Sequence, residues 1–89
     1  MEFEWNPSKA ATNFTKHGVT FSEAATVFGD PLEVTIADPD HSVGEFRFLS
    51  IGRSEAGRLL VVAYTERNNH IRIITAWPVM PREARRYES

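Results

Sequence analysis

The spacing of hydrophobic residues changes once along the chain, from a helical period to a strand period. After a short alternating segment at Phe3–Trp5, apolar residues recur at helical spacing up to Gly29. From Leu32 onward, apolar and polar residues alternate, which is typical of half-buried strands. Helices followed by strands indicate an α+β domain with its helices on one face of the sheet.

Two helices are expected in the first third of the chain. Asn6-Pro7 is a typical helix start, with Asn as the N-cap and Pro at the first helical position. This helix is predicted to run to His17 and to end at Gly18, which tolerates the left-handed conformation. Thr20–Glu23 has the spacing of a capping box and starts the second helix, which Gly29–Pro31 ends.

Four strands and a short helix are expected to follow. The strands are Leu32–Ala37, Phe46–Ile51, a central strand whose most apolar part is Leu59–Tyr64, and His70–Ala76. Asn68-Asn69 predicts a two-residue turn that pairs Val61–Arg67 with His70–Ala76, because Asn tolerates positive φ. A short helix is expected to begin at Pro81. The predicted order is β-α-α-β-β-β-β-α, with a small antiparallel sheet.

Length and composition narrow the class of protein. Eighty-nine residues predict a single domain over residues 1–89. The absence of cysteine excludes disulfides and thiolate chemistry, and no apolar segment approaches the length of a membrane helix. Acidic residues stand where a signal peptide would carry Lys or Arg, so we expect a cytoplasmic protein with no membrane partner. We also expect no cofactor.

Charge is divided unevenly between the two halves of the chain. Residues 1–46 hold two lysines and eight acidic residues, whereas residues 47–89 hold eight arginines and four acidic residues. The planar fork of arginine suits phosphate and carboxylate groups, so the second half favours an anionic ligand. The alternative is a polar sheet face whose arginines pair with nearby acids.

Two groups of residues could carry chemistry. Lys16-His17 lies at a helix C-terminus, where the helix dipole favours positive charge, although simple capping would use the same residues. At the predicted hairpin, Arg67 and His70 project together, with Arg72 two residues further along the same face. Such a group matches the needs of metal-free RNA cleavage: a proton acceptor, a proton donor and arginines on the phosphate. An exposed hairpin with solvated charges is the alternative.

Two further features concern metal and binding. The three histidines lack partners at the helical spacing that metal sites favour, so we expect no metal site. Arg82, Arg85 and Arg86 form a basic C-terminal stretch beside Tyr87. This stretch could follow a phosphate backbone or bind an acidic partner, and a solvated helix is the alternative.

Segments along nearly the whole chain resemble the BrnT family of toxins. The KHGVTF, TER and RIITA segments are the most specific. The residues that carry the resemblance are Phe3-Glu4-Trp5-Asn6, Lys9, Asn13, Lys16–Phe21, Glu23-Ala24, Asp30-Pro31, Asp38, His41, Arg47, Ile51–Ser54, Gly57-Arg58, Tyr64–Arg67, Ile71–Ala76, Glu83 and Tyr87.

The resemblance implies the toxin half of a type II toxin–antitoxin pair, with a fold similar to RelE-type ribonucleases. It implies RNA cleavage that halts translation, and neutralisation by a BrnA-like ribbon-helix-helix antitoxin. Operator DNA would be bound only through the antitoxin, and a homodimer could form within a larger complex. The site hypothesis is that His17, Glu66, Arg67 and Arg72 are catalytic, and that Lys16, Arg82, Arg85 and Arg86 bind RNA.

One departure from the family pattern bears on activity. Trp77 stands where the family usually has an arginine, and Ala84 replaces a further basic residue. An arginine lost from the scissile phosphate would remove about 2 to 4 kcal/mol of transition-state stabilisation. The alternative hypothesis is therefore a catalytically weakened homologue that acts mainly as antitoxin-binding partner and co-repressor. Trp77 could also stack on a base or extend a protein interface.

Overall fold

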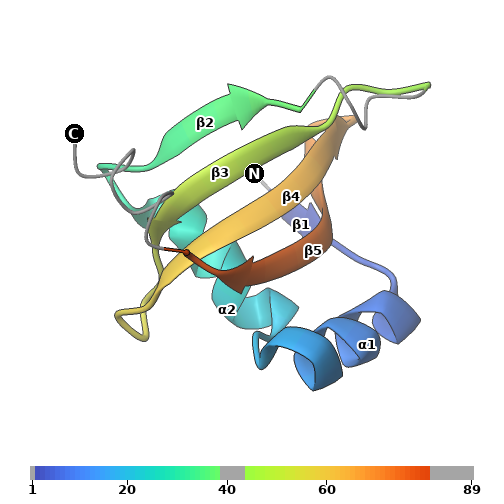
Figure 1. Ribbon diagram of the computed structural model, residues 1–89. Coiled ribbons are helices and arrows are strands. Elements are labelled where there is room, and N and C mark those ends of the chain that lie inside the picture. The colour runs from blue at the N-terminus through green and yellow to red at the C-terminus, as the bar shows by residue number, and fades with distance from the viewer. Residues whose placement is uncertain (1, 39–43, 81–89) are drawn as a thin grey trace.

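Five strands form one curved sheet in the order β1-β5-β4-β3-β2, and two helices pack against it (Figure 1). The computed structural model describes residues 2–38 and 44–80. The elements are β1 (Glu2–Glu4), α1 (Pro7–His17), α2 (Phe21–Thr26), a 3₁₀ turn (Val27–Gly29), β2 (Val34–Ala37), β3 (Phe48–Arg53), β4 (Leu59–Arg67) and β5 (His70–Pro78). The C-terminal helix predicted from Pro81 lies outside the described residues, as do Arg82, Arg85 and Arg86.

The sheet is mixed, so the prediction of an antiparallel sheet is wrong for its first strand. β1 runs parallel to β5, with Glu2 beside His70 and Glu4 beside Arg72. All the other strand pairs are antiparallel. Alternation of polar and apolar residues predicts that a segment is a strand, but it carries no information about the direction of a distant partner.

The hairpin between β4 and β5 has the register expected from the sequence. Asn68 and Asn69 adopt φ values of 48° and 66°, which are the positive values that a two-residue turn requires. Arg67 pairs with His70, and Glu66 pairs with Ile71, as predicted. One irregularity in the pairing lies further along, between Ala63 and Tyr64.

Strand ends deviate from the predictions by about two residues. β2 begins at Val34 rather than Leu32, because Asp30 accepts hydrogen bonds from the backbone N–H groups of both Leu32 and Glu33 and holds a turn. β3 covers Phe48–Arg53 instead of Phe46–Ile51, and Phe46 is exposed.

Both helices begin where their capping residues predict. Asn6 Oδ1 accepts hydrogen bonds from the Ser8 and Lys9 backbone N–H groups, and Gly18 ends α1 with φ 69°. Thr20 Oγ1 accepts a hydrogen bond from the Glu23 N–H at 3.0 Å. The described contacts contain only this half of the capping box, because the Glu23 carboxylate binds other side chains.

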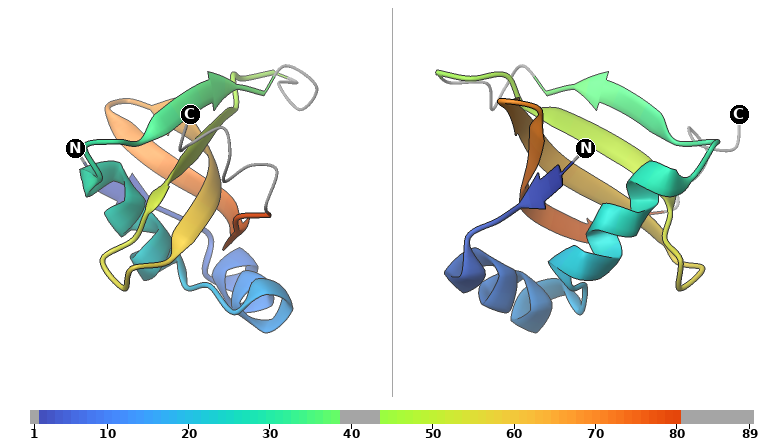
Figure 2. Two further views of the ribbon diagram at one scale, coloured as in Figure 1. Left: turned by 60° about the vertical axis from the view of Figure 1, so that its left-hand side comes forward. Right: turned by 180° about the vertical axis from the view of Figure 1, so that it is seen from behind.

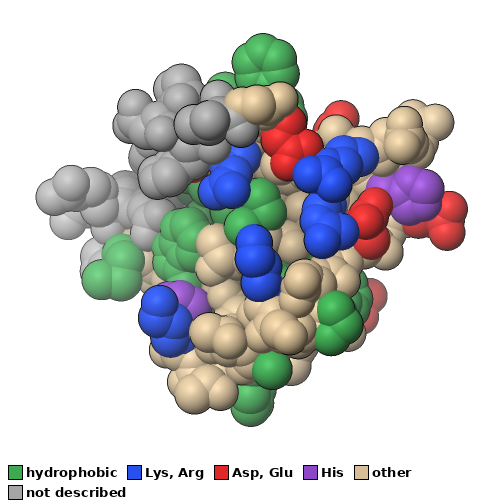
Figure 3. All heavy atoms as spheres, turned by 90° about the vertical axis from the view of Figure 1, so that its right-hand side faces the viewer, with side chains coloured by type: hydrophobic (Ala, Val, Ile, Leu, Met, Phe, Trp, Pro, Cys, Tyr) green, Lys and Arg blue, Asp and Glu red, His purple; other side chains and the backbone are tan. Residues whose placement is uncertain are grey.

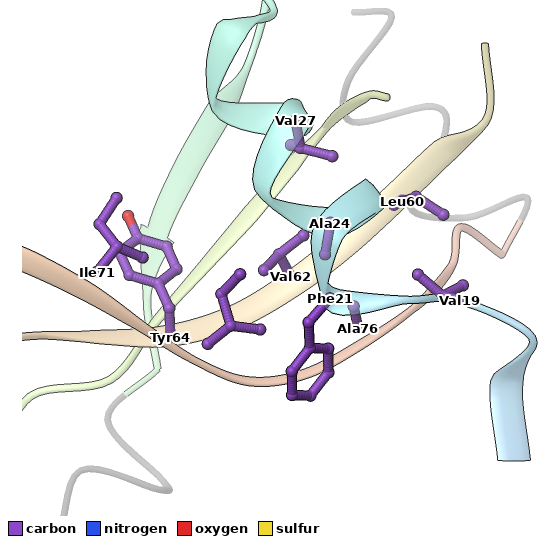
Figure 4. Close-up of a cluster of buried hydrophobic side chains, with 10 residues drawn as sticks. Val19, Phe21, Ala24, Val27, Leu60, Val62, Tyr64, Ile71 and Ala76 are labelled. Carbon is purple, nitrogen blue, oxygen red and sulfur yellow. The ribbon is translucent and has the colours of Figure 1, made fainter. Parts of the chain in front are cut away.

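The core lies between α2 and the sheet (Figures 2 and 4). Its members come from the α2 region and from β4 and β5: Val19, Phe21, Ala24, Val27, Leu60, Val62, Tyr64, Ile71, Ile73 and Ala76. Successive strand residues point to opposite faces. We call the side packed against α2 the core face. The opposite side, which carries Ala63, Thr65 and Arg67 of β4, is the second face.

Candidate active site

Two arginines of the second face lie close together near the β4–β5 turn. Arg67 is the last residue of β4 and lies opposite His70, while Arg72 lies opposite Thr65. Residues opposite each other in antiparallel strands share a face, with Cβ atoms about 5 Å apart. Arg67, His70 and Arg72 therefore project from one end of the second face.

Each of the two arginines binds a carboxylate. Arg67 donates from Nε and Nη2 to the two carboxylate oxygens of Glu45, both at 2.8 Å. Arg72 Nη1 donates to Glu4 Oε2 at 2.7 Å. Charge-assisted hydrogen bonds are strong, and the forked pair that Arg67 makes is also directional. Phosphate is the other common partner of arginine.

A third arginine lies in the field of the same carboxylate. The hydrogen bonds from Arg67 hold the pKa of Glu45 below its ordinary value, and the positive charges of Arg67, Arg47 and Arg72 act in the same direction. Burial opposes this shift only in part. Arg67 therefore binds a carboxylate that is held in its charged form.

His70 presents one ring nitrogen to the surroundings. Its Nδ1 lies 2.9 Å from the Asn68 carbonyl oxygen, which only accepts hydrogen bonds, so Nδ1 carries the proton. In the neutral ring, Nε2 then holds a lone pair and is able to accept a proton. Nε2 lies 3.4 Å from Glu2 Oε2, which would face the ring when it is protonated.

The hairpin end is hollowed. A depression of about 220 Å³ is lined by Glu66, Arg67, Asn68, Asn69 and His70. Glu66 pairs with Ile71, a residue of the core face, so its side chain leaves the strand on the side opposite to Arg67. The predicted residues Glu66 and Arg67 therefore border one depression from opposite sides of β4.

His17 lies at a distance from this group. Its ring is 6.4 Å from that of Trp77, measured between centroids. Trp77 follows Arg72 by five positions on β5, which corresponds to roughly 16 Å along a strand. The structure thus brings Glu66, Arg67 and Arg72 to one end of the sheet and places His17, with Lys16, at the other.

His17 and Lys16 belong to a groove between α1 and β5. The groove has a volume of about 270 Å³ and is lined by Ser8, Lys9, Thr12, Asn13, Lys16, His17, Ile74 and Thr75. Figure 3 shows Lys and Arg side chains spread across one face of the molecule, with histidine side chains at opposite sides of it. Cations therefore occupy both the groove and the hairpin end.

Asn13 fixes the position of α1 and with it the groove. Its Nδ2 donates to the Val19 and Ala76 carbonyl oxygens, at 3.0 and 2.9 Å. Its Oδ1 accepts from the Thr75 hydroxyl and the Ala76 N–H, at 2.8 and 3.1 Å. The amide thus occupies the β5 edge where β1 does not reach, in place of a further strand.

Several residues of these sites were not expected from the sequence. They are Lys9 in the groove and Glu4, Glu45 and Arg47 at the hairpin end. Glu4 approaches Arg72 only through the parallel β1–β5 pair, and Glu45 lies in a connection that has no periodic pattern. His70 was noticed beside Arg67, but it was not among the predicted catalytic residues.

The described part of the chain contains neither a candidate metal site nor a membrane-spanning helix. Within residues 2–38 and 44–80, no group of three or more His, Asp or Glu side chains is placed to hold a metal ion. No helix in those two ranges is long and apolar enough to cross a membrane.

The fold and these sites define a small α+β domain with a cation-rich surface. A family model described as "Ribonuclease toxin, BrnT, of type II toxin-antitoxin system" matches residues 5–88. The chain therefore belongs to the BrnT family of ribonuclease toxins of type II toxin–antitoxin systems. Membership of a type II system implies an antitoxin partner.

A solved structure confirms the likeness in fold. It is the 1.1 Å crystal structure of the Brucella abortus ribonuclease toxin BrnT, which is 18% identical to this chain with a TM-score of 0.66. The match covers 90% of this chain and 97% of the Brucella chain. A search among curated proteins found no significant match.

Proposed function

We propose that this chain is an endoribonuclease that cleaves RNA at the β4–β5 hairpin end, without a metal ion, by attack of the ribose 2′-OH. The observation that carries the proposal is that Arg67 and Arg72 project from one end of the second face and that each binds a carboxylate there. A phosphodiester carries the same charge as that carboxylate and accepts the same forked hydrogen bonds. It would replace Glu45 and Glu4 as the partner of the arginines.

The side chains at the hairpin end supply the remaining chemistry. Nε2 of neutral His70 accepts the proton of the 2′-OH as the 2′-oxygen bonds to phosphorus. The bond from phosphorus to the 5′-oxygen breaks, and that oxygen receives a proton from solvent. Arg67 and Arg72 stabilise the charge that grows on the phosphate oxygens in the transition state. The products are a 2′,3′-cyclic phosphate and a 5′-hydroxyl.

Glu66 and His17 have different roles in this proposal. Glu66 borders the hairpin depression and is the second candidate for the proton acceptor. His17, Lys16 and Lys9 line the α1–β5 groove, where they would bind the RNA backbone away from the cleaved bond. The basic residues Arg82, Arg85 and Arg86 would extend this contact, as expected from the sequence.

Substitution of the arginines tests the proposal. Arg67→Gln and Arg72→Gln should each lower the cleavage rate about 100-fold or more, because each removes a charge-assisted contact with the transition state. The matched control is Arg53→Gln, at the opposite end of the sheet, where the guanidinium group binds only the Gly57 carbonyl oxygen among the contacts described. Equal rates for all three variants would refute the assignment.

Product analysis and the histidines test the chemistry. Cleavage should continue in excess EDTA and leave a cyclic phosphate end, whereas 3′-hydroxyl products or a requirement for Mg²⁺ would contradict 2′-OH attack.

His70→Ala should abolish the rise of the cleavage rate with pH that reports proton acceptance, and His17→Ala should weaken RNA binding and leave that pH profile unchanged. The reverse pattern would assign the proton transfer to His17.

The partner proposals follow from the family resemblance. We expect a BrnA-like ribbon-helix-helix antitoxin to bind this chain and block cleavage, and operator DNA to be bound only through that antitoxin. A homodimer within a larger complex and a cytoplasmic location belong to the same proposal. Co-expression with such an antitoxin, followed by measurement of copurification and residual cleavage, tests the pairing.

A second candidate function rests on Trp77. Its ring lies beside His17 at 6.4 Å, in the position where the family usually carries an arginine. A homologue without that arginine would cleave slowly and act mainly as antitoxin-binding partner and co-repressor. Normal growth after induction of soluble protein without antitoxin would favour this function over the first one.

A further inference from the structure

Thr65 carries a buried hydroxyl that the fold leaves without a partner. The residue is 1% exposed. Among the side chains of residues 2–38 and 44–80, its Oγ1 is the one buried nitrogen or oxygen atom that makes no hydrogen bond. Buried hydroxyl groups are normally paired, and each exception calls for an explanation.

The missing hydrogen bond has a stability cost that another residue would avoid. Valine is similar to threonine in shape and is equally suited to a strand. It would fill the same space and leave no hydroxyl without a partner. Folding alone therefore gives no reason for a threonine at this position, and the hydroxyl points to a ligand.

The position of Thr65 identifies the chemistry of that ligand. Thr65 lies directly opposite Arg72 across the β4–β5 pair and two residues before Arg67 on the same face of β4. Its short side chain ends close to the sheet, between the two longer arginines. A ligand held by both guanidinium groups would bring an acceptor oxygen toward Thr65 Oγ1.

We infer that Thr65 Oγ1 donates a hydrogen bond to a phosphate oxygen of bound RNA, the same phosphate that Arg67 and Arg72 hold. This inference rests on the proposed function. In the unliganded chain the two arginines bind Glu45 and Glu4. When their guanidinium groups turn to the phosphate, the hydroxyl between them gains its acceptor.

Thr65→Val separates this role from a structural one. Removal of an unpaired buried hydroxyl should raise the melting temperature by about 4 °C or more. The same variant should bind RNA and cleave it about 10- to 100-fold less well, because a hydrogen bond to a charged oxygen is lost. Thr65→Ser keeps the hydroxyl and should retain most of the activity.

Thr35→Val is the matched control. Thr35 lies on β2, and its hydroxyl already contacts Glu33 and Ser50. This variant should cleave RNA at the parent rate without a rise in melting temperature. A fall in melting temperature for Thr65→Val, or cleavage at the parent rate, would overturn the inference.

Binding of a 2′-O-methyl oligoribonucleotide distinguishes the inference from the function on which it rests. This probe keeps the phosphates but lacks the attacking hydroxyl. Arg72→Gln should reduce the salt dependence of its affinity by about one counterion, whereas Thr65→Val should weaken affinity at an unchanged salt dependence. Loss of affinity in Arg72→Gln with none in Thr65→Val refutes the inference alone. No loss in either variant refutes the phosphate site.

Discussion

Replacement of Asn13 by alanine removes the side chain that joins α1 to β5. Four groups, three of them buried and one partly buried, would lose a partner: the carbonyl oxygens of Val19 and Ala76, the Ala76 N–H and the Thr75 hydroxyl. At about 1 kcal/mol for each hydrogen bond, the free energy of unfolding should fall by about 4 kcal/mol. A domain of this size is stable by roughly 5 to 13 kcal/mol in total, so the loss is a large fraction.

The measurement is denaturant unfolding followed by tryptophan fluorescence and by circular dichroism. Thr12→Ala is the matched control, because Thr12 lies one residue earlier on α1 and is exposed. Its unfolding free energy should change by less than about 0.5 kcal/mol. A loss below about 1 kcal/mol in Asn13→Ala would refute the view that the amide holds α1 to the sheet.

Asn13→Asp separates the donor bonds from the shape of the side chain. Aspartate keeps both the size and the accepting oxygens, but its carboxylate faces the Val19 and Ala76 carbonyl oxygens without a donor. The variant should therefore be less stable at pH 7 than at pH 4, where protonation restores one donor. Equal stability at the two pH values would show that the donor bonds contribute little.

Three further predictions follow from contacts in the structure. The hydrogen bond from Arg58, followed by that from Ser54, lowers the pKa of Glu23 against an opposing effect of burial. The stability from this pair is present above the ordinary pKa of about 4.5 and is lost as pH falls below it. Denaturant midpoints should thus decline less between pH 5 and pH 3 in Glu23→Gln than in the parent. Trp77→Arg should raise cleavage about tenfold if position 77 contacts phosphate, whereas an unchanged rate with weaker antitoxin binding would place Trp77 in an interface. Glu45→Gln should tighten binding of a 2′-O-methyl oligoribonucleotide by removing a competitor for Arg67, and unchanged affinity would contradict that competition.

Local signals in the sequence were sufficient for the helix starts and for the hairpin. The helix ends are set by capping residues that contact only the adjacent helical turn, namely Asn6-Pro7, Gly18 and Thr20. The Asn68-Asn69 turn likewise sets the register of the two strands that it joins. Each of these features depends on residues that are neighbours in the chain. A pattern read along the sequence therefore contains the information that these structures need.

The parallel β1 strand and the clamp at Asn13 depend on contacts between distant residues. Asn13 is a polar residue, yet it is buried because its amide meets the edge of β5. The predicted group of catalytic residues shows the same limit. Arg67 and Arg72 are joined by a hairpin whose register was predictable, whereas the position of His17 depends on how α1 packs against the sheet.

The fold pairs basic residues from the second half of the chain with acidic residues from the first half. Each described ion pair of an arginine joins the two halves: the arginine comes from the second half and the carboxylate from the first. The pairs are Arg72–Glu4, Arg58–Glu23 and Arg67–Glu45. The arginines are therefore paired with acidic residues, as one of the two interpretations of the sequence expected. These acidic residues are remote in the sequence and not nearby.

These ion pairs differ in how much they contribute to the fold. The Glu23 carboxylate also binds Ser54, and Arg58 also donates to the Gly18 carbonyl, so this pair links α2 to the β3–β4 connection. Arg67 and Arg72 have carboxylates as their described side-chain partners. Both pairs are partly exposed to solvent, and such pairs contribute little to stability. In the proposed function, an incoming phosphate would therefore replace those carboxylates at a small cost in folding free energy.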